Sequence, residues 1–286
     1  METKSVDAGE FRDGQRQQWN RAATGWRKWS ELIDESASAI SERLVELAGV
    51  GPGSRVLDVA AGYGEPSLTA ARRTGPEGEV VATDISAEMI AFGRERAAAA
   101  GLENIEFVES DAASLRFPEG SFDAALSRWG IIFEPDGEAA AARIRSFLKP
   151  GARMAISSWG PPDRVPMLAI PMGTAMQRLE VPPPPPGTPG PLSRPTPEAL
   201  GGLLEAAGFS DVEVEQAEVS FEWQSAEEFT AFMKEIAPPI SAMIAPHPRE
   251  VQDETWAAIT EAIREKAGDD GAVRLTNLVL LAAGRA

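Results

Sequence analysis

The sequence predicts an α/β fold in which a mostly parallel sheet is doubly wound, with helices on both faces. Short apolar runs alternate with helix-like segments over residues 55–158. Small-residue turns and acidic residues follow these runs where strands would end. Two longer alternating segments, 211–223 and 273–282, then suit an antiparallel pair at one sheet edge. Together these observations favour right-handed βαβ units closed by an antiparallel strand near the C-terminal end.

The first 30 residues are interpreted as an arm that packs on the body of the protein. They contain three tryptophans among polar residues, Trp19, Trp26 and Trp29. Such side chains need a surface to cover. Helical spacing of apolar residues predicts a helix over 40–48. We therefore divide the chain into an aromatic arm or lid, 1–35, and one domain, 36–286.

Strands and helices alternate through the core of this domain, 55–158. The expected strands are 56–59, 80–83, 105–108, 122–127 and 153–157. Pro66 suits the first turn of a helix that continues to Arg73. Ser86 and Asp136 suit the N-caps of two further helices. The pattern predicts a parallel sheet covered on both faces.

The chain changes character after residue 159. Residues 160–197 contain most of the prolines, including the run 182–186, and cannot supply regular strands. Two interpretations stay open for this insertion. It is either a spacer or a lid over a site, because long loops inside a compact domain often carry function.

Regular structure resumes with a helix over 196–208, followed by the strand 211–223. The apolar alternation of that strand changes phase between Val214 and Val219, which predicts a bulge or bend. Residues 224–272 form a helical insertion between the last two strands. Its first helix starts at a Ser225-x-x-Glu228 capping box and stops at Pro238-Pro239, and its second contains 256–263.

Charge and composition exclude several classes of function. The 286 residues include 44 acidic and 27 basic side chains, a formal net charge of −17. Nucleic acids and anionic membrane surfaces are bound by basic patches, so neither is an expected partner. No apolar run approaches the ~20 residues that span a bilayer, and the polar N-terminus is unlike a signal peptide, so we expect a cytoplasmic protein.

Metal and thiol chemistry are also disfavoured. The chain has no cysteine and a single histidine, His247. Thiolate metal sites, cysteine nucleophiles and multi-histidine metal sites are therefore excluded, and a Ser-His-Asp triad is disfavoured. We expect no bound metal.

The informative residues follow successive strands, where ligands of parallel α/β sheets bind. The first strand runs into the turn Asp58-Val59-Ala60-Ala61-Gly62-Tyr63-Gly64. Gly62 and Gly64 lack Cβ atoms, so a ligand can approach the backbone closely. The second strand ends in Asp84, whose carboxylate can accept two hydrogen bonds from the vicinal hydroxyls of a ribose.

The third strand is followed by Asp111, which could accept a hydrogen bond from the exocyclic amine of adenine. Apolar neighbours would enclose the ring, namely Ile85, Met89 and Ala112. A dinucleotide fits less well, because Glu65 would place a negative charge beside its pyrophosphate. A cationic sulfonium suits this turn better, which favours S-adenosylmethionine over NAD.

With these residues in place, 55–158 resembles a class I S-adenosylmethionine-dependent methyltransferase. The matching segments are Val56–Gly64, Val81–Ser86, Ser110–Ala112, Phe122–Ser127 and Leu148–Gly151. The resemblance is closest to the ubiquinone/menaquinone-biosynthesis-like group of small-molecule methyltransferases. It implies a Rossmann-like seven-stranded sheet whose last strand is inserted antiparallel. Ala60 departs from the pattern, since many members have a glycine there.

The resemblance and the strand ends together give a set of expected cofactor contacts: Asp58, Ala60, Gly62, Gly64, Asp84, Ile85, Met89, Asp111, Ala112 and Ser127. Candidates for a catalytic role are Tyr63, Arg128 and His247. The implied partner is a small-molecule methyl acceptor, apolar or aromatic, whose accepting atom stays open between carbon, oxygen and nitrogen. A nucleotide-cofactor oxidoreductase, a non-catalytic binding protein and a homodimer are the alternatives left open.

Overall fold

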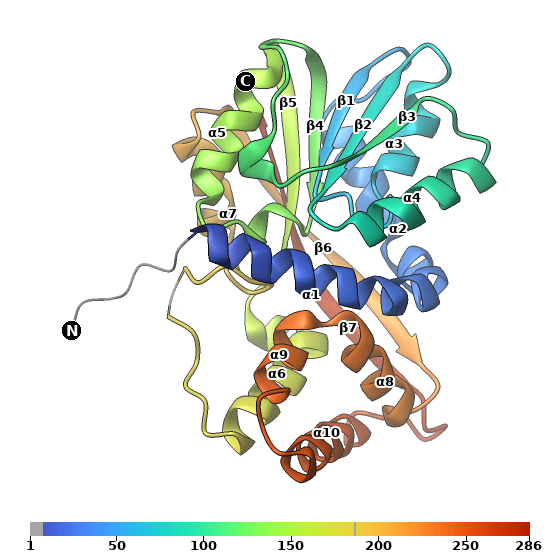
Figure 1. Ribbon diagram of the computed structural model, residues 1–286, viewed down its shortest axis with the longest axis vertical. Coiled ribbons are helices and arrows are strands. Elements are labelled where there is room, and N and C mark those ends of the chain that lie inside the picture. Colours follow the sequence, from blue (N-terminus) through green and yellow to red (C-terminus); the bar gives the residue numbers. More distant parts are fainter. Residues whose placement is uncertain (1–7, 186) are drawn as a thin grey trace.

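The computed structural model describes residues 8–185 and 187–286. Residues 1–7 of the predicted arm and Pro186 of the proline run lie outside the described residues. Within the described ranges, seven strands form one sheet in the order β3-β2-β1-β4-β5-β7-β6 (Figure 1). The strands are β1 (Arg55–Val59), β2 (Glu79–Asp84), β3 (Ile105–Glu109), β4 (Phe122–Arg128), β5 (Leu148–Trp159), β6 (Ser210–Trp223) and β7 (Val273–Arg285).

The strand directions confirm the predicted fold class. Strands β1 to β5 pair in parallel, whereas β7 is antiparallel to both β5 and β6. The last strand is therefore inserted between β5 and the edge strand β6, as the resemblance implied. All seven expected strands are present, and β5 is the one that extends furthest beyond its predicted range.

Helices cover both faces of the sheet. They are α1 (Ala8–Lys28), α2 (Ser30–Leu47), α3 (Ser67–Thr74), α4 (Ala87–Ala99), α5 (Gly137–Phe147), α6 (Pro166–Arg178), α7 (Pro197–Ala206), α8 (Ala226–Ile236), α9 (Pro238–Ile244) and α10 (Arg249–Arg264). Alternate strand residues enter separate cores, because successive side chains point to opposite faces. Val56 packs with α2 and α3, and Leu57 packs with α5 and α7.

The predicted helix starts are confirmed by their capping bonds. Ser86 Oγ accepts a hydrogen bond from Met89 N at 3.2 Å, and Asp136 Oδ1 accepts one from Ala139 N at 2.9 Å. Ser225 Oγ accepts from Glu228 N at 3.1 Å. These bonds satisfy backbone N–H groups that have no partner within the first helical turn. The local signals therefore located the helix starts correctly.

Three expectations were wrong or incomplete. The proline-rich insertion 160–197 contains a helix, α6, because Pro166 occupies its first turn, where a missing N–H costs nothing. Residues 238–239 likewise end α8 but also begin α9. The expected helix 40–48 is only the C-terminal part of α2. For α6 and α9, proline marks a helix start, although the sequence interpretation read it as a break. For α2, the apolar periodicity identified only the C-terminal part of the helix.

The predicted bulge inside β6 is also wrong. The pairing of β6 with β7 is continuous from Glu213 to Trp223, and its register shift lies earlier, between Ser210 and Glu213. The apolar phase changes because the two ends of β6 bury opposite faces. Val214 packs with the cluster that contains α7, and Val219 packs with the cluster that contains α8.

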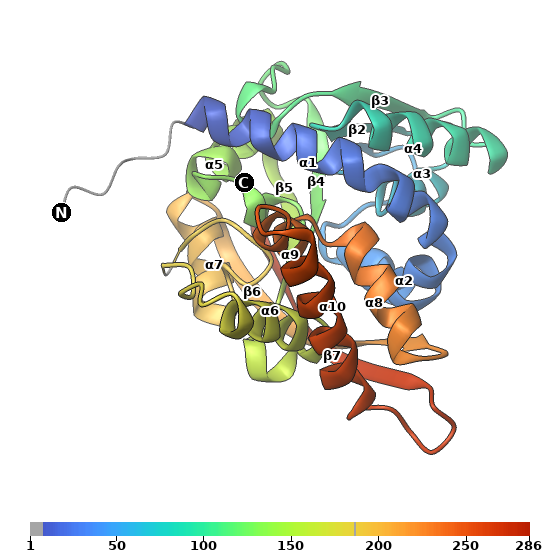
Figure 2. The same cartoon turned by 60° about the horizontal axis from the view of Figure 1, so that its bottom comes forward.

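The arm forms a long helix that crosses the carboxyl ends of the central strands. Figures 1 and 2 show α1 running between the sheet with α4 on one side and the helices α8 and α9 on the other, and α1 contacts all three helices. Gly25 permits this closeness, because a Cβ there would lie 2.4 Å from the carbonyl oxygen of Glu235. No helix in the described part of the chain is long and apolar enough to cross a membrane.

Candidate cofactor and acceptor site

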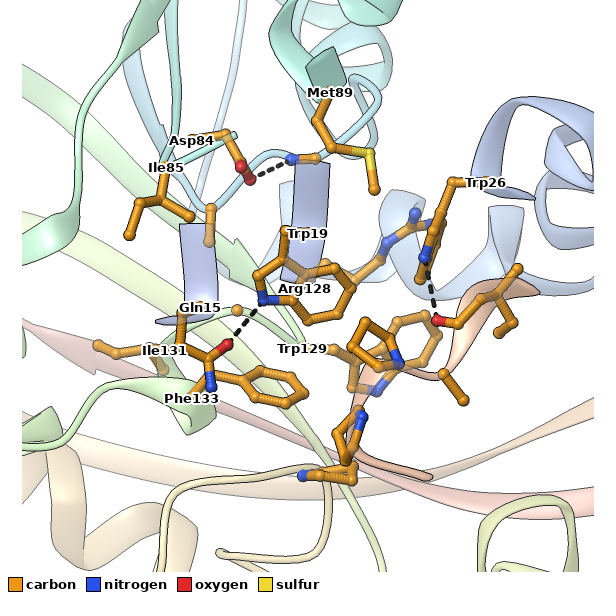
Figure 3. Close-up of a pocket in the computed structure, with 18 of the residues that line it drawn as sticks. Gln15, Trp19, Trp26, Asp84, Ile85, Met89, Arg128, Trp129, Ile131 and Phe133 are labelled. Carbon is orange, nitrogen blue, oxygen red and sulfur yellow. Dashed lines mark hydrogen bonds between the residues drawn. The ribbon is translucent and has the colours of Figure 1, made fainter. Parts of the chain in front are cut away.

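A cavity lies under α1 at the carboxyl ends of the central strands (Figure 3). The turns after β1, β2 and β3 supply one part of its lining, which we call the carboxylate end. It contains Ala60–Tyr63, Asp84, Ile85, Met89 and Ser110–Ala112. Helices α6, α8 and α9 with strand β6 supply the other part, which we call the apolar end. Figure 3 shows Trp19 and Trp26 projecting from α1 into the cavity.

The turn after β1 has the backbone that a close ligand requires. Ala60, Gly62 and Gly64 have φ angles of 57°, 55° and 112°. A Cβ added to Gly62 would meet no atom within 4 Å, so the space beside this glycine is open to a ligand. Ala60 holds the left-handed conformation at the position where the family pattern has glycine. An L-residue there costs about 1–2 kcal/mol, so the departure is structurally tolerated but strained.

Asp84 is anchored by the same turn. Its Oδ2 accepts a hydrogen bond from Gly62 N and its Oδ1 accepts one from Ser86 N, each at 2.8 Å. Burial raises the pKa of Asp84 to about 6, against the lowering effect of the backbone amides. Each carboxylate oxygen keeps a second lone pair. The side chain is therefore fixed in place with acceptor capacity left for two ribose hydroxyls.

Asp58 is fully buried behind the turn. Its Oδ2 accepts a hydrogen bond from Ser67 Oγ at 2.5 Å, and its Oδ1 has no partner among the described residues. Burial raises the pKa of Asp58 to about 7. A buried carboxylate oxygen without a partner is costly unless a ligand satisfies it. A cationic group such as an ammonium would fit it.

Two carboxyl groups and one arginine from three different elements meet beside the turn after β3. Asp111 Oδ1 accepts a hydrogen bond from Ser114 N at 3.0 Å and lies 3.9 Å from Arg12 Nε on α1. Glu134 also lines the cavity, and burial together with the charge of Asp111 raises its pKa to about 7. The sequence interpretation missed Arg12 and Glu134, because neither belongs to a strand end.

The cavity brings together most of the predicted site residues. Seven of the expected cofactor contacts line it: Ala60, Gly62, Asp84, Ile85, Met89, Asp111 and Ala112. Asp58 and Gly64 lie behind this lining. Ser127 does not line it either, because its buried Oγ accepts a hydrogen bond from Ile131 N at 3.0 Å and holds the turn after β4. His247 lies in the loop between α9 and α10, outside the cavity lining.

Tyr63 and Arg128 line the cavity but are tied to α2. The Tyr63 hydroxyl donates to Asp34 Oδ1 at 2.9 Å and accepts from Arg128 Nη2 at 3.2 Å. Arg128 Nη1 also donates to Ser41 Oγ at 2.9 Å. Burial raises the pKa of the Tyr63 phenol above its usual value, so this hydroxyl keeps its proton. Tyr63 is therefore a link between the turn and α2 and a poor general base.

Arg128 is a buried cation. Burial lowers its pKa, but the neighbouring Tyr63 and Glu65 raise it, and the net shift is upward. None of the described carboxylates forms an ion pair with it within 4 Å. Arg128 therefore places a positive charge in the wall of the cavity, with its Cζ 5.3 Å from the ring centroid of Trp129.

The apolar end contains no ionisable side chain from α6, α8, α9 or β6. These elements contribute Met167, Leu168, Met172, Phe221, Phe232, Ile236, Ala237, Pro238, Pro239 and Ile240. Trp129 and Trp159 form one wall, with parallel rings whose centroids are 4.5 Å apart. Trp129 has a φ of 54°, which is rare for a bulky residue and clusters at functional sites.

The carboxylate end fits a nucleoside that carries positive charge. Asp84 and Asp111 line it with carboxylate oxygens that can accept hydrogen bonds from hydroxyl or amine groups, and Asp58 adds a buried carboxyl group behind the turn. The sheet order and this site define the class I S-adenosylmethionine-dependent methyltransferases, whose cofactor is S-adenosylmethionine. Residues 56–151 match a protein family described as "Methyltransferase domain". The chain therefore carries a methyltransferase domain of this class.

Comparison with known proteins agrees with this class. The ubiquinone/menaquinone biosynthesis C-methyltransferase UbiE of Pseudomonas putida is 40% identical over 138 residues, which are 46% of this chain and 54% of that protein. The aligned part of the chain thus spans about half the length of the curated relatives that it matches.

Two solved structures share the fold at low identity. Phosphoethanolamine N-methyltransferase 2 of Haemonchus contortus, in complex with S-adenosyl-L-methionine, has a TM-score of 0.59 at 20% identity, covering 99% of this chain and 61% of that one. The [4+2]-cyclase SpnF has a TM-score of 0.54 at 23% identity, covering 87% and 82%. This likeness concerns the fold, which is shared by proteins of different named activities.

Proposed function

We propose that the protein transfers a methyl group from S-adenosylmethionine to a small apolar or aromatic molecule. The observation that carries the proposal is that the carboxylate end and the apolar end line the same cavity. The turns after β1 to β3 present carboxylates, while α6, α8, α9 and β6 present only apolar side chains. A cationic nucleoside suits the first surface, and an apolar acceptor suits the second.

The chain would act mainly by positioning. Bound S-adenosylmethionine supplies an electrophilic methyl group on a sulfonium. Asp84 would hold the ribose and Asp111 the adenine amine, and the ionised carboxylate of Asp58, behind the turn after β1, would attract the ammonium. Trp129 and Trp159 would orient a flat acceptor, and the apolar lining would exclude water. Orientation of this kind can supply a large share of the rate enhancement of a two-substrate reaction.

The charge at the junction favours an anionic acceptor over an amine. Arg128 is a buried cation without an ion-pair partner among the described residues, so it would lower the pKa of a nearby phenol or enol. The same charge would repel an ammonium group. Tyr63 keeps its proton, and the apolar end offers no base. We therefore propose a phenolate or enolate as the nucleophile. The acceptor releases its proton to solvent as it binds, its oxygen or carbon then forms the new bond to the methyl group, and the broken carbon–sulfur bond leaves S-adenosylhomocysteine.

A nucleotide-cofactor oxidoreductase is the less favoured reading of the same cavity. Glu65 lines it beside the turn after β1, and its carboxylate accepts a hydrogen bond from Thr69 Oγ1 at 2.7 Å. This carboxylate would repel a pyrophosphate. A helix N-terminus that binds such an anion works through positive partial charge, which Glu65 opposes.

Two measurements test the proposal. Calorimetry with S-adenosylhomocysteine and with NADH and NADPH should show binding of the first ligand alone. Transfer of labelled methyl from S-adenosylmethionine to a metabolite extract should give an apolar labelled product, whose structure identifies the acceptor. Binding of NADH or NADPH in place of S-adenosylhomocysteine would reject the methyltransferase function. Tight S-adenosylhomocysteine binding without methyl transfer to any extract would favour a non-methylating role.

A further inference from the structure

One face of α1 lies along the cavity from end to end. Arg12, Gln15, Trp19 and Trp26 line the cavity, and their spacing of three, seven and fourteen residues places them on one side of a helix. Trp19 Nε1 donates to Gln15 Oε1 at 2.9 Å, which fixes the indole within this face (Figure 3). The helix therefore presents an ordered surface to the carboxylate end as well as a hydrophobic cover.

A residue beside Trp19 joins α1 to the start of α4. Asn20 Oδ1 accepts a hydrogen bond from Ser86 Oγ at 2.7 Å, and Glu88 N lies 3.5 Å from the same oxygen. Both partners can donate, so the carbonyl oxygen of the amide is the atom that fits here. Ser86 Oγ in turn accepts from Met89 N as the N-cap of α4.

Ser86 connects this contact to the ribose acceptor. Its backbone N–H donates to Asp84 Oδ1 at 2.8 Å, and the other oxygen of Asp84 accepts from Gly62 N. Asn20, Ser86, Asp84 and Gly62 thus form one continuous chain of hydrogen bonds from α1 to the turn after β1. Asp84 and Ser86 are both buried, so water does not compete for the hydrogen bond between them. A shift in the position of Ser86 therefore changes the orientation of the Asp84 carboxylate.

The same helix reaches the opposite end of the nucleoside site. Arg12 Nε lies 3.9 Å from Asp111 Oδ1. Arg12 and Asn20 are eight residues apart, which is about 12 Å along a helix. That span suits contacts at both ends of an adenosine, with the ribose near one residue and the adenine near the other.

We propose that α1 is part of the cofactor site and that Asn20 is a positioning residue for the ribose. Asn20 holds Ser86, and Ser86 sets the orientation in which the Asp84 carboxylate meets the two hydroxyls. This inference rests on the proposed function. It adds a recognition element that is distant in sequence from the turns after β1 to β3.

The test is calorimetric binding of S-adenosylhomocysteine to the full chain. Asn20→Ala should weaken binding roughly 3- to 10-fold, the value of one lost hydrogen bond in a fixed network. The effect of Asn20→Ala should depend on the ribose hydroxyls. Asn20→Ala should weaken the binding of 5′-methylthioadenosine more than that of its 2′,3′-dideoxy analogue, which lacks these hydroxyls. In a Ser86→Ala background, Asn20→Ala should have little further effect, because the intermediate partner is gone.

Gln18→Ala is the matched control. Gln18 lies on α1 but lines a separate surface depression with Lys28 and Lys234, so its substitution should leave affinity unchanged. Unchanged affinity in Asn20→Ala, or an equal loss for ligands with and without ribose hydroxyls, overturns the role of Asn20. A wild-type chain that binds no S-adenosylhomocysteine overturns the proposed function itself, so the two failures are distinguishable.

Discussion

The two ends of the cavity are built in opposite ways. The carboxylate end comes from three turns that each follow a strand, all between Ala60 and Ala112. The apolar end comes mainly from α6, β6, α8 and α9, none of which has a ligand-binding motif, with Trp129 and Trp159 as one wall. The first end is a set of polar groups held by backbone amides, and the second is a packed hydrophobic wall. The comparison teaches that the turns of the carboxylate end are close together in sequence, whereas the apolar end is assembled from distant segments.

Substitution of Asp84 tests the carboxylate end and is expected to have the largest effect on ligand affinity. Asp84→Ala should weaken S-adenosylhomocysteine binding by roughly 1–3 kcal/mol, because two ribose hydroxyls lose their charged acceptor. Calorimetry measures it, and Glu119→Ala, an exposed change in the loop before β4, is the control. Unchanged affinity in Asp84→Ala would remove this residue from the site.

At the other end, Met172→Glu should impair the acceptor and spare the cofactor. A carboxylate in the apolar lining would repel an anionic acceptor and solvate its pocket, so KM for the acceptor found by label transfer should rise roughly tenfold or more. Met172→Leu keeps the volume and should behave as wild type. If Met172→Glu instead weakens S-adenosylhomocysteine binding and leaves KM unchanged, the division into two ends is incorrect.

Acid should affect the carboxylate end first. Burial raises the pKa of Asp58 to about 7 and that of Asp84 to about 6. A cationic ligand binds the ionised forms, so affinity for S-adenosylmethionine should fall roughly tenfold from pH 8 to pH 5.5, with protons released on binding. Stability responds with the opposite sign: these two groups favour folding at low pH, and that contribution is lost as pH rises through about 6 to 7.

Calorimetry at several pH values, in buffers of different ionisation enthalpy, measures both the affinity and the released protons. Asp58→Asn serves as the comparison, since it cannot ionise. Its affinity should be lower at pH 8 and vary less with pH. A pH-independent affinity in the wild-type chain would contradict the ionic role of both carboxylates.

The smallest expected effect concerns the strained turn. Ala60→Gly should raise the free energy of unfolding by about 0.5–1 kcal/mol, because relief of the left-handed strain exceeds the added freedom of the unfolded chain. Urea denaturation measures this change. Ala61→Gly, at a buried neighbour without a positive φ, should destabilise instead. The Ala60 methyl also lies against Gly130 in the turn after β4. A loss of stability in Ala60→Gly would show that this contact outweighs the strain.

Sequence reasoning succeeded where one short segment sets its own geometry. The strand predicted over 56–59, the cap at Ser86 and the acidic end of β2 each depend on neighbouring residues alone. It failed at α6 and at the phase change of β6. Proline permits either a break or a helix start, and an apolar face says nothing about which layer will cover it. Both outcomes depend on partners far away in the chain.

The sequence by itself determined the fold class, the small-residue turn after β1 and the carboxylates at the ends of β1 to β3. Alternating periodicity and turn chemistry act over a few residues, so each of these features is visible locally. Only the tertiary structure decided that Ser127 holds a turn, that His247 lies away from the cavity, and that Arg12, Asn20 and Glu134 approach the carboxylate end. Packing brings Asn20 to Ser86, which is 66 residues later in the chain, and Arg12 to Asp111, which is 99 residues later. Such contacts leave no local pattern, since they are fixed by burial of the whole helix rather than by the residues beside them.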